Sequence, residues 1–294
     1  MKIFSLKSIF TAFIIITINF WPAIGSDDLK PFKIFEADGG SADFDDILDA
    51  AEDADVIFFG ELHGNPICHW TEYRLLKALD EKFPGKISLG VEMFERDDQL
   101  KIDEYFSGVA TTKNFENEAK LWDNYKTDYK RSLEYAKSKK IPYYGTNVPR
   151  RYAAFVARNG LAALDSLNSI QKGYISKLPI ETDYELPGYK KMSPHGMPQS
   201  PDMKYLVEAQ MIKDATMAQT IYENIRNGKF LHFNGTYHSD NHEGVVWYLK
   251  RLNPKLRILT ISSTEQDSVD ELSKDNKELA DYILVIPSDM IRSF

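Results

Sequence analysis

Six short apolar runs constrain the fold of this chain more than any other feature of its sequence. They are rich in β-branched and aromatic residues without strict alternation, which is typical of parallel strands buried on both faces. Helical patterns lie between several of these runs, and this order favours an α/β fold, a mostly parallel sheet with helices on both faces. The predicted strands are Asp55–Phe59, Ile87–Val91, Ile141–Tyr144, Phe230–Phe233, Arg257–Ile261 and Tyr282–Ile286.

Three helices are predicted between the first and third strands. Pro66–Phe83 begins with a proline, which is common at the first helical position, and ends before a Pro-Gly pair that stops a helix. Arg96–Phe106 and Asp128–Lys139 are amphipathic, with charges on one face. These segments supply the crossovers that parallel strands require.

The connection between the third and fourth strands is far longer than one crossover needs, at about 85 residues. It contains helical patterns at Tyr152–Ala163 and Met203–Arg226, separated by Leu178–Pro201, which is rich in Pro, Gly and Tyr. We therefore predict a helical insert over about 150–227, with a long irregular loop of the kind that often forms a lid or a binding loop.

The first residues indicate export. An apolar run of roughly a dozen residues, Ile9–Phe20, follows two lysines and precedes small residues around Gly25. A membrane-spanning helix needs about 20 apolar residues, so a retained anchor is the weaker interpretation. We expect a signal peptide over 1–25, one mature domain over 26–294, and a periplasmic location.

Composition narrows the class of protein further. Cys68 is the only cysteine, so there is no cysteine near the expected cleavage site for lipoprotein acylation and no internal disulfide is possible. The formal net charge is −8 and no basic run offsets it, which argues against nucleic acid as a partner.

Polar residues follow the predicted strands at the edge where parallel sheets bind ligands. Glu61 and His63 follow the first strand, Glu92 follows the second and His238 follows the fourth. Carboxylates and imidazoles can hold a divalent metal such as Zn, Mn or Co with water in an open position, or can perform acid–base chemistry without one. His242 joins His238 as a metal-ligand candidate if a helix begins at about Ser239, since residues four apart share a helix face.

Each of these residues also has a structural interpretation. For Glu61 and His63 the weaker, structural interpretation is a loop carboxylate and a capping imidazole at the start of the following helix. Glu92 ends an apolar run, where an ionised group is costly unless it pairs with Arg150 or a histidine. The histidines expected inside a helix and a strand, His69 and His232, are interpreted as ordinary packing residues.

Four motifs in this order resemble one known family, the ChaN family of haem-binding uptake proteins, which belongs with the Tiki, TraB and erythromycin-esterase-like proteins. The resemblance covers roughly Phe35 to Pro287. The motifs are Gly60-Glu61-x-His63, Glu92-Met93-Phe94, Asn147-x-Pro149-Arg150 and Gly235-x-x-His238.

The resemblance implies a haem-binding protein of iron acquisition, with haem often held between two protomers. Outer-membrane haem or iron uptake components are the expected partners. A tyrosinate suits ferric iron, so a tyrosine is the expected ligand. Tyr152 is the first candidate, at the start of the insert, and Tyr189 and Tyr237 are the others. Further candidates for the haem site, chiefly as partners of the propionates, are Arg150, Arg151, Lys190, Lys191 and His195.

Two alternatives remain open. One is a metal-dependent hydrolase, a Tiki-like protease or an esterase-like enzyme, that uses Glu61, His63, Glu92 and His238. The other is a partner-binding periplasmic module whose polar edge is structural. Fold alone does not decide between these functions and haem binding, and we expect a binding protein rather than an enzyme.

Overall fold

An eight-stranded sheet forms the centre of the computed structural model, which describes residues 29–192, 201–225 and 228–293. The strand order is β2-β1-β8-β7-β3-β6-β4-β5, and every pair from β8 to β5 is parallel. All six predicted strands are present, which confirms the α/β class. They are β3 (Val56–Glu61), β4 (Ile87–Glu95), β5 (Tyr143–Asn147), β6 (Lys229–Gly235), β7 (Ile258–Gln266) and β8 (Tyr282–Pro287).

Two strands escaped prediction. The four residues of β1 (Lys33–Glu36) pair antiparallel with β8, and the two residues of β2 (Ser41–Ala42) pair antiparallel with β1. Both lie at one edge of the sheet, where strands are short and half-exposed, so they lack the apolar run that identifies a buried strand.

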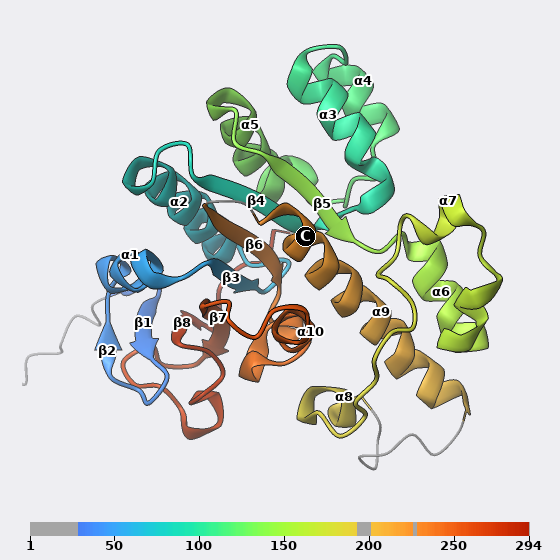
Figure 1. Cartoon of the computed structure of the whole chain (residues 1–294). Coiled ribbons are helices and arrows are strands. Elements are labelled where there is room, and N and C mark those ends of the chain that lie inside the picture. The colour runs from blue at the N-terminus through green and yellow to red at the C-terminus, as the bar shows by residue number, and fades with distance from the viewer. Residues whose placement is uncertain (1–28, 193–200, 226–227, 294) are drawn as a thin grey trace, which may run out of the picture. The chain divides into compact units, whose positions relative to one another are not determined.

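Alternate side chains of β3 enter two separate cores. Ile57 and Phe59 pack on the face covered by α1 (Phe44–Asp53), α2 (Pro66–Lys82) and α5 (Lys130–Lys139). Val56 and Phe58 pack on the opposite face, which is covered by α9 (Pro201–Asn224) and α10 (Val245–Leu252) (Figure 1). Burial on both faces explains why this strand is apolar without alternation.

The predicted helices are found with shifted ends. α2 matches Pro66–Phe83 to within one residue, because Asn65 caps it and Pro66 opens it. The predicted Arg96–Phe106 becomes a 3₁₀ turn, Arg96–Asp98, followed by α3 (Gln99–Ser107), and a short π-helix, Tyr125–Tyr129, precedes α5. α4 (Thr112–Glu118), like α1, was not predicted.

The helical insert lies between β5 and β6. α6 (Arg150–Asn159) and α9 pack against each other through an apolar cluster that includes Tyr152 and Ile212. Between them lie a 3₁₀ segment, Leu161–Ser166, and the short helices α7 (Ser169–Lys172) and α8 (Pro187–Lys191). In Figure 1 the insert extends to one side of the sheet, and α9 returns across it.

The segment that follows β6 differs from the expected helix. The helix expected from Ser239 is wrong: Thr236–His238 and Asp240–His242 form 3₁₀ turns, and α10 begins only at Val245 because His242 has a positive φ of 58°. The expected signal peptide lies outside the described residues. Among the residues that are described, no helix has the length and apolar character required to cross a bilayer.

Candidate functional site

The carboxyl ends of β3, β4 and β6, which are neighbours in the sheet, open into a cavity of about 540 Å³. Four residues predicted from the strand ends line it together: Glu61, His63, Glu92 and His238. The insert and the last residues of the chain complete the lining with Met192, Gln210, Lys213 and Arg292. Met192, Gln210, Lys213 and Arg292 were not predicted, because they do not follow strands and no periodicity in the sequence places them at this edge of the sheet.

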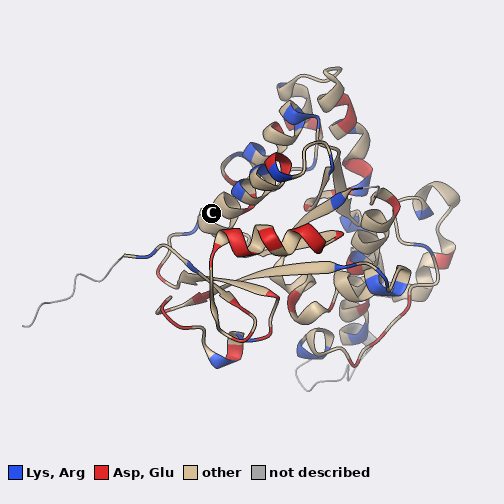
Figure 2. Ribbon diagram, turned by 60° about the vertical axis from the view of Figure 1, so that its left-hand side comes forward, with Lys and Arg blue, Asp and Glu red and all other residues tan. Residues whose placement is uncertain are grey.

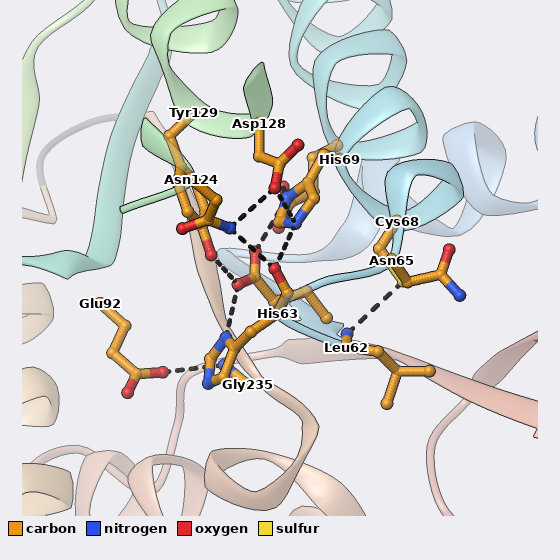
Figure 3. Close-up of polar contacts among 12 residues, drawn as sticks. Leu62, His63, Asn65, Cys68, His69, Glu92, Asn124, Asp128, Tyr129 and Gly235 are labelled. Atoms are coloured by element: carbon orange, nitrogen blue, oxygen red, sulfur yellow. Dashed lines mark hydrogen bonds and ion pairs between the residues drawn. The ribbon is translucent and has the colours of Figure 1, made fainter. Parts of the chain in front are cut away.

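Glu61 and His63 form the first pair. The Nδ1 atom of His63 lies 2.7 Å from Oε1 of Glu61, and Tyr129 donates its hydroxyl to the same oxygen at 2.5 Å (Figure 3). The Glu61 side chain is buried, whereas the His63 side chain is 42% exposed. Burial alone would lower the pKa of His63, but the Glu61 carboxylate raises it above its usual value.

Gly235 has no side chain, and this leaves room for the His63 ring. A Cβ atom at Gly235 would lie 2.8 Å from Cε1 and 2.9 Å from Nε2 of His63, closer than side chains tolerate. The Gly235 amide donates to Oε2 of Glu92 at 2.8 Å, so the end of β6 also holds the second carboxylate in place (Figure 3).

Glu92 and His238 form the second pair, with a partner that the sequence did not predict. Nε2 of His238 lies 3.1 Å from Oε1 of Glu92, and Nδ1 contacts the buried carboxylate of Asp214 on α9. Burial opposes a charged imidazole, but the Glu92 and Asp214 carboxylates outweigh it and raise the pKa of His238 to about 10. His238 is therefore an imidazolium at neutral pH, with both ring nitrogens turned to carboxylates.

A third group of polar residues lies behind Glu61. His69, expected to be an ordinary packing residue, is 4% exposed, and its ring nitrogens lie 3.5 Å from Glu61, 3.1 Å from Glu72 and 3.7 Å from Asp128. Burial and the charge of Glu61 hold the pKa of Glu72 well above its usual value. The His-x-x-Glu spacing on one helix face was the available signal, but it is common on helices without such partners.

The three tyrosines predicted as iron ligands have different environments. Tyr152 is only 5% exposed and packs between α6 and α9. Tyr189 is 4% exposed, and its hydroxyl donates to Asp214 at 2.6 Å. Tyr237 lines the cavity, is 38% exposed, and donates its hydroxyl to the carbonyl of Gly188 at 2.8 Å.

Five other predicted site residues are described by the structure and do not line this cavity. Arg150 lines a separate cavity beside Trp122. Arg151 pairs with Asp97, and Lys190 pairs with Glu185 at 2.5 Å. The remaining two are Lys191, which is exposed at the end of α8, and His242, which lies 3.6 Å from Asp281, whereas His195 is outside the described residues.

Lys and Arg are interspersed with Asp and Glu along the elements that Figure 2 displays. Several of these charges pair across the surface, as in Lys82 with Asp49 and Arg292 with Glu265. The charge pattern offers no continuous basic face in this view, in keeping with the acidic composition.

The fold and this cavity define an α/β protein with a histidine–carboxylate site at the carboxyl ends of parallel strands. The family model for haem-binding uptake proteins, Tiki superfamily, ChaN, matches residues 47–249, and the chain belongs to this family. No curated protein matches the sequence.

One solved structure shares the fold. The structure described as cofacial haem binding to ChaN of Campylobacter jejuni is 18% identical, with a TM-score of 0.65 over 88% of this chain and 98% of that one. A Bacillus cereus protein is 13% identical, with a TM-score of 0.46 over 84% and 92% of the two chains. A mutant erythromycin esterase, EreC, in an open conformation is also 13% identical, with a TM-score of 0.46 over 80% and 77%.

Proposed function

We propose that this protein binds haem over the cavity at the carboxyl ends of β3, β4 and β6, and that it serves haem uptake in the periplasm. The observation that carries the proposal is the state of His63. Its Nδ1 is held by Glu61, its side chain is 42% exposed at the cavity, and Nε2 has no hydrogen-bond partner among the described residues. Membership of a haem-binding family supports haem as the ligand of the protein.

The residues present fit a haem group. An imidazole whose second nitrogen donates to a carboxylate is the usual form of a metal-ligating histidine, because the carboxylate fixes the ring and increases its basicity. Bound haem would supply a ferric iron that accepts this nitrogen. Half-exposed Met192 and Tyr237 provide apolar surface for the porphyrin, and the cations of Lys213 and Arg292 can face its propionates.

His63 is a better ligand than the tyrosines first considered. Tyr152 and Tyr189 are buried in packing that would have to open before either could reach iron. Tyr237 is accessible, but burial and the Asp214 carboxylate raise the pKa of its hydroxyl, which disfavours the tyrosinate. Tyr237 is therefore assigned to the porphyrin face rather than to the iron.

A haemin titration followed by absorbance tests the site. The wild-type protein should bind saturably, and His63→Ala should change the spectrum and weaken binding. The matched control is His242→Ala, since the two histidines have similarly exposed side chains of 42% and 45%. Loss of binding in both variants, or in neither, would contradict the assignment of His63.

The tyrosine assignment has its own control. Tyr237→Phe should keep the spectrum, because the ring remains while the hydroxyl is lost. Tyr222 has a comparable exposure, 39% against 38%, and lines a different cavity, so Tyr222→Phe is the matched variant. A charge-transfer band that vanishes only in Tyr237→Phe would show that Tyr237, and not His63, is the iron ligand.

Three further parts of the proposal can be checked on the same protein. Sedimentation with and without haemin tests whether protomers pair on a shared haem. The mass of the protein recovered from the periplasm tests cleavage after Gly25. Crosslinking in cells tests contact with outer-membrane haem or iron uptake components.

The cavity also supports a metal-dependent hydrolase as a second candidate function. The observation in its favour is that Glu61, His63, Glu92 and His238 all line one cavity. His238 fits this role less well than His63, because both of its ring nitrogens already face carboxylates. A flat haemin titration together with ester or peptide hydrolysis that needs a divalent metal, and that Glu61→Ala abolishes, would favour the hydrolase.

A further inference from the structure

We propose that Glu61, His69 and Glu72 form a buried site for a divalent metal ion with mixed nitrogen and oxygen coordination, such as Zn²⁺. One ligand atom from each of the three residues can be chosen so that all lie within 4.8 Å of one another. His69 and Glu72 share a face of α2, and Glu61 ends β3 directly before it. This site lies behind the cavity and does not depend on haem binding.

The orientation of His69 leaves a nitrogen lone pair at the centre of the site. Nε2 lies 2.9 Å from the backbone carbonyl of His63, which can only accept, so Nε2 carries the proton (Figure 3). In the neutral ring, Nδ1 is then unprotonated, 3.5 Å from Oε2 of Glu61 and 3.1 Å from Oε2 of Glu72. Once Glu72 gives up its proton to an entering ion, three electron-pair donors face one another.

Two buried oxygens in this group lack partners. Oε2 of Glu61 and Oε1 of Glu72 have no hydrogen-bond partner among the described residues, although the two residues are only 3% and 1% exposed. In the same part of the chain, the ion pairs of both carboxylates are with histidines alone. Burial and the charge of Glu61 raise the pKa of Glu72, so a proton compensates one of the two charges when no ion is bound. A cation between the two carboxyl groups would displace that proton and supply the compensation itself.

The distances suit a metal of zinc type. Bonds of about 2.0–2.2 Å in a tetrahedron place the ligand atoms roughly 3.3–3.5 Å apart. The separations from Nδ1 of His69, 3.1 and 3.5 Å, bracket that range. A small movement of the carboxylates would complete the coordination.

The surrounding residues hold the ligands as metal sites require. Asp128 lies 3.7 Å from Nε2 of His69, so a carbonyl and a carboxylate both face the far side of the ring. The other oxygen of Glu61 is fixed by Tyr129 and His63. Because Glu61 also lines the cavity, an ion can approach the site past the exposed His63.

The test uses the full mature protein, stripped with a chelator and titrated with Zn²⁺ against a chromophoric competitor, and with Co²⁺ followed by its visible spectrum. One equivalent should bind, with a tetrahedral Co²⁺ spectrum and a higher melting temperature. Glu72→Gln keeps the side-chain shape and should weaken Zn²⁺ binding at least 10-fold. Glu208→Gln, a buried glutamate on α9 held by Leu161 and Tyr184, is the matched control and should bind like wild type.

Two outcomes would overturn the site. Wild-type protein that binds neither ion would show that protons rather than a metal compensate the carboxylates. Zn²⁺ binding that survives Glu72→Gln but disappears in His63→Ala would place the ion in the cavity instead. If Glu72→Gln fails to fold, His63→Ala decides the matter: a Co²⁺ spectrum retained in His63→Ala places the ion in the buried site, and a lost spectrum places it in the cavity.

Discussion

Oε1 of Glu61 is shared by two donors, since it lies 2.7 Å from Nδ1 of His63 and 2.5 Å from the Tyr129 hydroxyl. His63 is at the cavity and Tyr129 is in the interior, so one buried oxygen connects the proposed iron ligand to the core. The orientation of His63 therefore depends on a charge that is almost completely buried.

Glu61→Gln tests that dependence. The amide keeps the shape but removes the negative charge, so His63 should become a weaker donor to ferric iron. In chelator-treated protein, we expect haemin affinity to fall about 10- to 100-fold and the midpoint potential to rise. Spectroelectrochemical titration measures both quantities, with Glu208→Gln as the control. Unchanged affinity and potential would contradict the role of Glu61.

Gly235→Ala should disturb the same ligand by steric contact alone. Gly235 has an ordinary φ of −60°, so alanine costs little in the backbone, but its Cβ would lie under 3 Å from the His63 ring. The ring must move, and haemin binding should weaken while the melting temperature changes little. Gly40→Ala, where the nearest atoms belong to flexible Asp and Glu side chains, should leave binding intact. A Gly235→Ala protein with wild-type binding would show that His63 is not held as described.

Asp214→Ala should be strongly destabilising. Asp214 is fully buried and holds both the His238 imidazolium and the Tyr189 hydroxyl. Removing one partner of a buried charge costs about 3–5 kcal/mol, whereas exposed pairs contribute less than about 1 kcal/mol. Urea unfolding should therefore separate Asp214→Ala from Asp97→Ala, which breaks the exposed pair with Arg151. Equal losses would mean that the His238 charge is compensated elsewhere.

His232 should make the protein acid-sensitive. Complete burial lowers the pKa of this imidazole from 6.5 to about 4, and it bonds to Thr146 and Asn234. Below pH 6.5 the unfolded chain takes up a proton at His232, whereas the folded chain does not. The contribution of His232 to the free energy of unfolding is therefore fully present above pH 6.5 and is lost as the pH falls towards 4. The loss corresponds to about 3 kcal/mol.

The measurement is the free energy of unfolding between pH 7 and pH 4 for wild type and His232→Gln. The wild-type curve should fall more steeply with acid than the variant curve, and His242→Gln, a change at an exposed histidine, serves as the control. Parallel curves for wild type and His232→Gln would show that this histidine does not titrate differently on folding.

The sequence allowed the central sheet and half of the site to be predicted. β3, β4, β6, β7 and β8 were recognisable because burial on both faces leaves an apolar run. β5 lies at the edge of the sheet, and the predicted Ile141–Tyr144 overlaps it by only two residues. Glu61, His63, Glu92 and His238 could be placed together because parallel strands end at one edge. Neither inference needs knowledge of how distant side chains pack.

The residues that escaped prediction depend on such packing. Asp214 comes from a long helix of the insert, and nothing local shows that it faces His238. Glu72 reaches Glu61 only because α2 folds back on β3. Tyr152 was favoured for its place after β5, but the same apolar ring is what joins α6 to α9. Local sequence cannot separate an accessible aromatic side chain from one used in packing.

The pairing of β1 with β8 has a consequence for the order of folding. These are the first and last strands of the described chain, and Phe35 lies opposite Ile283 in their register. β3 pairs with β6 and β7, which are synthesised much later, so its backbone hydrogen bonds are completed only when those strands are present. Contacts of such long sequence separation form slowly. A chain that is still being synthesised therefore cannot pair β1 with β8, and deletion of β8 would leave β1 without the strand that it pairs with in the central sheet.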